Sequence, residues 1–413
     1  MVGMRQQKND RILSDINFER NTILYRKCLV VLLIFALLTM SGLLYVQKLK
    51  ERIPDDITVI AGQEAVIAQT GQEIDSATVG SYELDCKLFG MFSIKQVSVD
   101  VVEQQEVIPC GMPIGLYVET DGVLVVDVGQ VQGADGLVYQ PSFAVIKEND
   151  YIVSINGKNI TRKKELTQAL NESGGEAVVV GLRRDQQFVE VKVTPIKVSD
   201  GEYQIGVWVR DNSQGIGTLT YVTQDGHFGA LGHGVSDMDT NEVMEVSRGL
   251  LYATNILSIV PGKSGTPGEI LGYIDYHDEY VRGTITKNDQ TGIFGTVNQS
   301  LVDSLQSEPV QLAFKQEIAC GEAKIRTSMF GETRDYDVEI ISINADNEEN
   351  KQFILQVTDE ELLAKTGGIV QGMSGSPILQ NGKLIGAVTH VFVNDPTKGY
   401  GVFAETMLSE AEK

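Results

Sequence analysis

The chain is poor in the residues that carry metal and thiol chemistry. Its 413 residues include four cysteines, four histidines and one tryptophan. No CxxC spacing occurs, so the sequence predicts no zinc or other metal site and no cofactor. Cys28 lies in an apolar run, which leaves Cys86, Cys110 and Cys320, an odd number that allows at most one disulfide.

Basic side chains are also scarce. The chain has 34 Lys and Arg against 56 Asp and Glu, a net charge of −22. Such a balance disfavours contact with phosphate backbones, so we predict no nucleic-acid partner and a water-exposed body. The imbalance is uneven, because residues 1–52 hold nine basic and four acidic side chains.

One apolar run, Cys28–Val46, is long enough to cross a bilayer, which needs about 20 residues. Six of the nine N-terminal basic residues precede it, so the N-terminus is predicted to stay in the cytoplasm and the chain from about residue 50 to be exported. A cleaved signal peptide is the alternative, but the run exceeds a usual signal core and no A-x-A-like site follows. We predict a cytoplasmic tail at 1–27 and a transmembrane anchor at 28–46.

Residues 47–102 are predicted as a tether with some strand content, because Ile94, Val97, Val99 and Val101 partly alternate with polar residues. The pattern is clearer over 103–198. Two apolar runs flank Thr120-Asp121-Gly122, which predicts a hairpin.

Two more turns and a helix follow in this region. Asn156-Gly157 and Asp185-Gln186 are predicted hairpin turns. Over 161–175, Leu166, Ala169 and Leu170 share one helical face.

This order of elements over 103–198 resembles a PDZ domain. Pro113, Ile114, Gly115 and Leu116 match the carboxylate-binding loop of that family, and Lys147–Gly157 matches its next strand. The resemblance implies that the module captures a peptide C-terminus, which adds as a strand to a sheet edge.

Residues 199–413 show short apolar runs separated by glycine turns and almost no helical period. This pattern is typical of all-β barrels and sandwiches, and about 200 residues suffice for two small barrels. The predicted fold is mainly β: a transmembrane helix, a PDZ domain and a double β-barrel.

The stretch "QGMSGSPILQNGKLIGAVTH" places Ser374 in a G-x-S-G turn before a hairpin at Asn381-Gly382. A hydroxyl nucleophile needs a base, an orienting group for the base and donors for the oxyanion. The amides of Gly372 and Ser374 are the predicted donors. A tight turn between buried strands is the structural alternative.

His233 is the predicted base, because Gly232 and Gly234 leave its faces open at the end of a strand. The other histidines are assigned to structure or surface. His227 is predicted in a solvated turn, His277 on the surface, and His390 in the core or beside a specificity pocket.

Two acids are candidates for orienting His233. Asp237 lies four residues after the histidine, and Asp359 lies between His233 and Ser374 in the chain. Each could instead accept backbone N–H bonds in a turn, as Asp commonly does.

With "LGHGVSD" and "TGGIVQGMSGSPILQNGKLIGAVTHVFVNDPTKGYG" in view, the chain resembles the stage IV sporulation protein B family of serine peptidases. The resemblance implies a chymotrypsin-like serine endopeptidase with Ser374 as nucleophile, His233 as base and Asp359 as acid. It also implies export to the space between the forespore and mother-cell membranes, and self-cleavage that could release the body from its anchor. The implied substrate is a membrane-bound inhibitor of an intramembrane protease, whose release activates the late mother-cell sigma factor.

Two other functions are weighed. A membrane-tethered PDZ scaffold with an inactive peptidase-like domain would explain the same fold, although the chain keeps a nucleophile and a base. A cysteine peptidase using Cys320 has a poor context, because one histidine follows it, seventy residues later.

Overall fold

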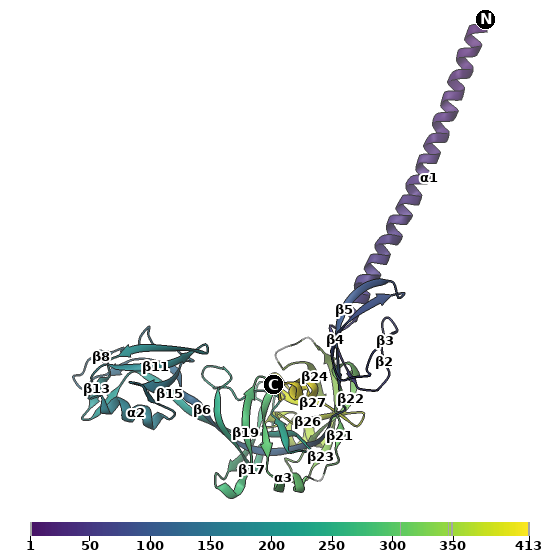
Figure 1. The fold of residues 1–413 in the computed structure, drawn as a ribbon. Coiled ribbons are helices and arrows are strands. Elements are labelled where there is room, and N and C mark those ends of the chain that lie inside the picture. Colours follow the sequence, from purple (N-terminus) through teal and green to yellow (C-terminus); the bar gives the residue numbers. More distant parts are fainter. Residues whose placement is uncertain (1, 306, 346, 348–349, 412–413) are drawn as a thin grey trace. The chain divides into compact units, whose positions relative to one another are not determined.

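The computed structural model describes residues 2–305, 307–345, 347 and 350–411. Strands are its main element, and the chain divides into two compact units, Met1–Gln104 and Gln105–Lys413 (Figure 1). The predicted fold class, mainly β with one N-terminal apolar helix and a β-barrel body, is confirmed.

The first unit begins with the long helix α1 (Val2–Arg52). Within its part Tyr25–Arg52, an 18-residue window has a mean hydropathy of 2.6 and is not buried, so length and composition make this part a candidate membrane span. The predicted anchor Cys28–Val46 lies inside this helix.

The rest of this unit is more ordered than the predicted tether. It holds five strands: β1 (Asp56–Ile60), β2 (Ala65–Ile67), β3 (Gln72–Ile74), β4 (Gly80–Leu88) and β5 (Phe92–Val102). A sheet of order β1-β5-β4 buries Val97, Val99 and Val101 of β5 in its own core. The valine alternation therefore marks a strand of a small folded unit.

The second unit contains a first barrel of six strands. They are β6 (Glu106–Val128), β15 (Val207–Thr223), β16 (His227–Ala230), β17 (Val246–Val260), β19 (Val281–Asp289) and β20 (Gly292–Val297). The ring runs β6-β15-β16-β20-β19-β17 and closes because β17 pairs with β6. Shorter elements accompany it: β18 (Gly268–Ile274), η1 (Asp278–Tyr280), α3 (Gln299–Ser304) and β21 (Val310–Gln311).

A PDZ-like module is inserted between the first two strands of that barrel. Strands β6 and β15 pair from Val107↔Thr223 in the barrel to Val128↔Val207 in the module. Between them lie β7 (Val131–Gln132), β8 (Val138–Tyr139), β9 (Tyr151–Ile155), β10 (Lys158–Asn159), α2 (Lys163–Glu172), β11 (Val178–Arg184), β12 (Gln187–Val193), β13 (Ile196–Ser199) and β14 (Glu202–Gln204). The predicted division, PDZ at 103–198 and then peptidase at 199–413, is linear, whereas β6 belongs to both parts.

The local predictions inside the module are confirmed. Helix α2 buries Leu166, Ala169 and Leu170 against the module core. Both Asn156-Gly157 and Asp185-Gln186 join paired strands with positive φ angles.

Two predictions on β6 are wrong. No hairpin forms at Thr120–Gly122, because β6 continues through these residues. Nor do Pro113–Leu116 form a carboxylate-binding loop, because this segment lies mid-strand between β15 and β17, with Leu116 opposite both Gly215 and Leu251. Both edges are occupied at Ile114–Leu116, and Ile114 is 1% exposed, so these residues form no loop that could surround a peptide carboxylate.

The second barrel is contiguous in sequence. It closes in the order β22-β23-β24-β28-β27-β26. The elements of this part are η2 (Lys315–Glu317), β22 (Gly321–Thr327), β23 (Arg334–Ile343), β24 (Phe353–Val357), α4 (Glu360–Thr366), β25 (Val370–Gln371), β26 (Pro377–Gln380), β27 (Lys383–Phe392), β28 (Asp395–Phe403) and α5 (Ala404–Ala411). The predicted turn Asn381-Gly382 joins β26 to β27.

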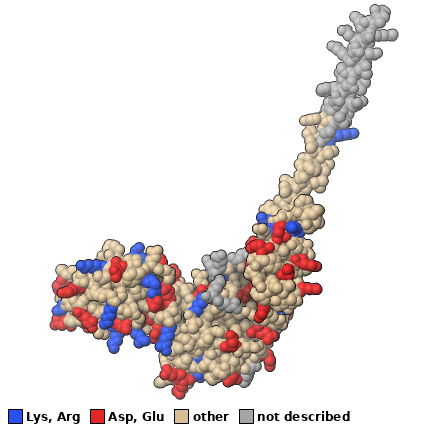
Figure 2. Space-filling view, viewed as in Figure 1, with Lys and Arg blue, Asp and Glu red and all other residues tan. Residues whose placement is uncertain are grey.

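Charged side chains of both signs cover the β-rich part. Figure 2 shows them interspersed on the face in view, without a continuous basic area.

Candidate active site

Ser374 lies in a tight turn that leads from β25 into β26. Gly372 and Gly375 adopt φ angles of 100° and 95°, a region that favours glycine. The amide of Ser376 donates to the Met373 carbonyl at 2.8 Å, and that of Gly375 donates to Val388 of β27 at 2.7 Å. The turn's own hydrogen bonds therefore leave out the amides of Gly372 and Ser374, the two predicted oxyanion donors.

The first barrel holds this turn from the other side. Thr218 of β15 donates its amide to the Ser374 carbonyl at 3.0 Å and its hydroxyl to the Gly372 carbonyl at 2.7 Å. A Cβ on Gly375 would lie 2.1 Å from the Thr218 carbonyl oxygen and 2.5 Å from the Leu231 amide. Only glycine permits this approach, so the turn is seated directly on the barrel that carries His233.

His233 follows β16, after Leu231 and Gly232, both with φ of 70°. Its Nδ1 lies 2.8 Å from the carbonyl oxygen of Gly234. A carbonyl only accepts, so Nδ1 carries the proton and Nε2 keeps its lone pair. Burial of the ring lowers the pKa of His233, and the bond to the Gly234 carbonyl partly opposes this. The imidazole is thus held in the neutral tautomer that a general base needs.

Ser374 and His233 come from different barrels and meet at the end of β27. The Ser374 hydroxyl donates to the Thr389 carbonyl at 2.6 Å. The His233 ring packs on that of the next residue, His390, with centroids 4.8 Å apart and planes 32° apart. Among the described residues, no hydrogen bond joins Ser374 to His233, and the Ser374 hydroxyl is bonded to a backbone acceptor instead.

His390 was predicted to lie in the core or beside a specificity pocket, and the first of these two predictions is wrong. It is exposed, with one ring face on His233. Loss of hydration on that side is the main cause that lowers the pKa of His390, followed by the nearby His233 and Lys351. The other histidines lie on the surface as predicted: the side chains of His227 and His277 are 63% and 79% exposed.

Neither candidate acid contacts His233 within the described part of the chain. Asp359 is the N-cap of α4, where its carboxylate accepts the Leu362 amide at 2.9 Å. Asp237 is buried, pairs with Arg210, and accepts the Asp239 amide at 2.9 Å. Each carboxylate thus accepts a backbone N–H close by in the chain, which is the structural alternative predicted for both acids.

Thiols and metal ligands make no second site. Over the described residues, no three His, Cys, Asp or Glu side chains gather as a metal site would require. Cys86, Cys110 and Cys320 are free thiols, and burial raises the pKa of Cys110 to about 12. The Cys320 thiol lies 3.5 Å from the Ile341 carbonyl, and within the described part of the chain no histidine is bonded to it.

Sequence reasoning missed the two threonines that organise the site. The Thr218 hydroxyl donates to the serine turn, and the Thr389 carbonyl accepts the Ser374 hydroxyl. Neither has a local motif, because each acts through a contact with a residue far along the chain.

Comparisons with known proteins place this geometry in a family. The family model described as SpoIVB peptidase S55 matches residues 201–408. A curated relative, the regulator of sigma-W protease RasP of Bacillus subtilis, is 26% identical over 166 residues, which are 39% of this chain and 35% of the relative. The chain thus spans about a third of the length of that relative.

Three solved structures are also similar. The active form of the Rv3671c protease from M. tuberculosis is 13% identical, with a TM-score of 0.30, over 49% of this chain and 74% of its own. The HtrA-type protease AlgW with a decapeptide is 12% identical, with a TM-score of 0.29, over 49% and 53%. The PDZ domain of an SdrC-like protein from Listeria monocytogenes is 19% identical, with a TM-score of 0.17, over 22% and 87%.

The family model covers half of the chain, including His233 and Ser374. The protein belongs to the SpoIVB peptidase S55 family.

Proposed function

We propose that this chain is a serine endopeptidase in which Ser374 is the nucleophile and His233 the general base. The observation that carries the proposal is the meeting of a G-M-S-G turn from one barrel and a glycine-flanked histidine from the other at Thr389 and His390. A neutral imidazole with a free Nε2 beside a serine hydroxyl is the arrangement that makes the hydroxyl a nucleophile.

In the proposed reaction the Ser374 hydroxyl leaves the Thr389 carbonyl and turns to Nε2 of His233. The imidazole takes its proton as the oxygen attacks a peptide carbonyl, and it then gives that proton to the leaving amine. The amides of Gly372 and Ser374 hold the oxyanion. Water, deprotonated by His233, then hydrolyses the acyl-enzyme in the same way.

The group that orients His233 in the described residues is the Gly234 carbonyl, bonded to Nδ1. Asp359 is the acid that the family resemblance implies, and Asp237 is its alternative. Since both make structural bonds, we propose Asp359 as orienting acid only on that resemblance, and its Asn variant tests it below.

The substrates are proteins. We propose that they include the chain itself and a membrane-associated inhibitor of an intramembrane protease, cleaved between forespore and mother-cell membranes so that the late mother-cell sigma factor matures. The family description and the candidate span support this sporulation role.

The test of catalysis compares Ser374→Ala and His233→Ala with the wild type. We expect each to lower kcat at least about 10⁴-fold on a protein substrate, to abolish labelling by a fluorophosphonate, and to keep the circular dichroism spectrum. N-terminal sequencing of the mature protein from wild type and Ser374→Ala identifies self-cleavage. An alanine protein that still cleaves would show the nucleophile to be another residue.

The proposed orientation can be tested with a native thiol. Cys320 is exposed, whereas Cys86 and Cys110 are buried. When the protein is expressed in cells that are not forming spores, where the exported side faces the medium, a membrane-impermeant maleimide added to intact cells should therefore label Cys320 if the body is exported, and Cys320→Ser should remove the label. Labelling only after lysis would place the body in the cytoplasm.

A further inference from the structure

Strand β17 leaves part of one edge unpaired. Its first half pairs with β6 as far as Ala253↔Ile114. The ladder stops there because the next residue of β6 is Pro113, which has no N–H to donate. Over Thr254–Val260, β17 pairs only with β18 among the described residues. Alternate N–H and C=O groups of this segment therefore point away from β18.

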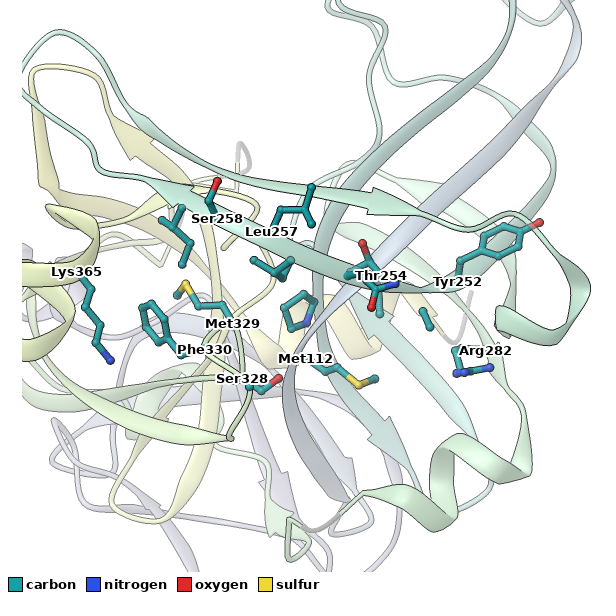
Figure 3. A pocket seen from close by; sticks show the side chains of 17 residues that line it. Met112, Tyr252, Thr254, Leu257, Ser258, Arg282, Ser328, Met329, Phe330 and Lys365 are labelled. Atoms are coloured by element: carbon teal, nitrogen blue, oxygen red, sulfur yellow. The ribbon is translucent and has the colours of Figure 1, made fainter.

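A hollow of about 810 Å³ lies along that edge. Figure 3 shows β17 on one side of it, with Leu257 and Ser258, and the β22–β23 turn on the other, with Met329 and Phe330. The volume falls in the range of ligand sites, about 300–1,000 Å³. Leu257 is 70% exposed beside it, although a leucine there would gain from being covered.

The ends of the hollow carry positive charge. Arg282 and Lys365 line opposite ends (Figure 3). Lys365 is paired with Glu361 at 2.7 Å. Arg282 donates to the carbonyls of Glu279 and Val281 and has no carboxylate partner within the described residues, in a chain of net charge −22.

We propose that the open edge of β17 binds an extended segment of a protein substrate, which adds as a further strand. Main-chain bonds to Thr254–Val260 supply the pairing, an apolar side chain enters the space beside Met329 and Phe330, and a carboxylate of the segment meets Arg282. This inference rests on the proposed function, because it supplies the peptidase with a second contact to its substrate.

The edge belongs to the same small sheet as the serine turn. β17 pairs with β18, and β18 pairs with β25 through Glu269↔Gln371, one residue before Gly372. The Ile270 side chain also lies 3.0 Å from where a Cβ on Gly372 would stand. The two strands β17 and β18 would therefore separate a bound segment from β25, which leads into the serine turn.

The test uses the full-length Ser374→Ala protein in nanodiscs, so that nothing is cleaved. The probe is a fluorescein-labelled heptapeptide, Asp-Val-Thr-Leu-Thr-Val-Asp, read by fluorescence anisotropy. Two matched probes carry N-methyl groups on one or the other alternate set of amides. Because only one set faces the edge, we expect one methylated probe to lose at least tenfold in affinity and the other less than threefold.

Variants locate the binding. Leu257→Asp should raise the Kd at least tenfold and Arg282→Gln about threefold or more, whereas Val393→Asp, at a residue 55% exposed outside the hollow, should leave it unchanged. Equal losses for both methylated probes, no binding at all, or full binding by Leu257→Asp would overturn the proposal.

This binding is measured without catalysis, so its failure is distinct from that of the proposed function. If Ser374-dependent cleavage persists while the probe does not bind, only the β17 site is rejected. If the probe binds but the wild type shows no Ser374-dependent cleavage, the assignment of the nucleophile is rejected instead.

Discussion

The two barrels of the second unit differ in how their strands follow one another. The second barrel, which carries Ser374, takes all its strands from Gly321–Phe403 in one continuous stretch. The first, which carries His233, takes β6 from before the PDZ-like module and β15 from the far end of it. Ser374, the proposed nucleophile, thus rests on local hairpins, whereas His233, the proposed base, depends on a strand pair that spans the module.

The family match sharpens this comparison. It begins at residue 201, after β6 has ended. Yet β6 pairs with both β15 and β17 and closes the first barrel. A domain defined by the matched residues alone would lack one of the six strands of the first barrel, and β15 and β17 would each expose an unpaired edge.

The largest effect is therefore expected from removing β6. A chain starting at residue 201 should fail to fold, as judged by loss of a cooperative thermal transition. The matched control keeps β6 and deletes the module, joining Glu119 to Asn212, which are paired residues, by an Asn-Gly turn.

This control should unfold cooperatively and keep Ser374-dependent labelling by a fluorophosphonate. If instead the 201–413 chain folds and the module deletion does not, the closure of the first barrel by β6 is refuted.

The contact between barrels gives the next largest effect. Gly375→Ala would place a Cβ against Thr218 and Leu231 of the first barrel. We expect a loss of about 3 kcal/mol in the free energy of unfolding, measured by urea denaturation.

Gly382→Ala is the matched control, because its φ is 77° but nothing lies within 4 Å of its Cβ position. It should cost only the strain of the left-handed conformation, about 1–2 kcal/mol. Equal losses for the two would mean that barrel contact adds nothing at Gly375.

The same difference explains what the sequence alone could predict. Turn residues such as Asn381-Gly382 and the buried face of α2 are local signals, and both are confirmed. The apolar length of α1 likewise identifies a candidate span without any tertiary contact.

What failed depends on distant pairing. Thr120-Asp121-Gly122 has turn chemistry, but β6 continues past it. Its register with β15 shifts opposite these residues and resumes at Leu124, while Thr120 pairs with Val246 of β17. Pro113–Leu116 matches a loop motif and lies in a barrel strand for the same reason. For the site, glycine spacing indicated Ser374 and His233, whereas partners such as Thr218 and Thr389 follow only from the closed barrels.

A smaller effect separates the two roles of Asp359. Asp359→Ala removes the N-cap of α4 and should cost about 1 kcal/mol of stability, which Asp359→Asn should restore because Asn caps equally well. The Asn variant then isolates the charge.

Kinetics of that variant decide the acid. A drop in kcat of about 10⁴-fold without loss of stability is what an orienting carboxylate predicts. A kcat near the wild-type value would leave Asp359 as a cap and the Gly234 carbonyl as the group that holds His233.

The smallest effect is on pH dependence, and it tests whether His233, the proposed base in the first barrel, is buried in the working enzyme. Burial lowers the pKa of His233 below the ordinary value of about 6.5. A general base acts when neutral, so a lowered pKa keeps it active at more acidic pH, and the acid limb of kcat/KM should have its midpoint below about 6.5. The measurement is kcat/KM from pH 4 to 8, with His390→Phe as control, because phenylalanine keeps a ring against His233 and removes the second titrating imidazole. Both proteins should show an acid limb with its midpoint below 6.5, since desolvation is the main cause of the lowered pKa. A midpoint at or above 6.5 in the wild type would show that His233 is hydrated in the working enzyme. The site would then be more open than the structure shows.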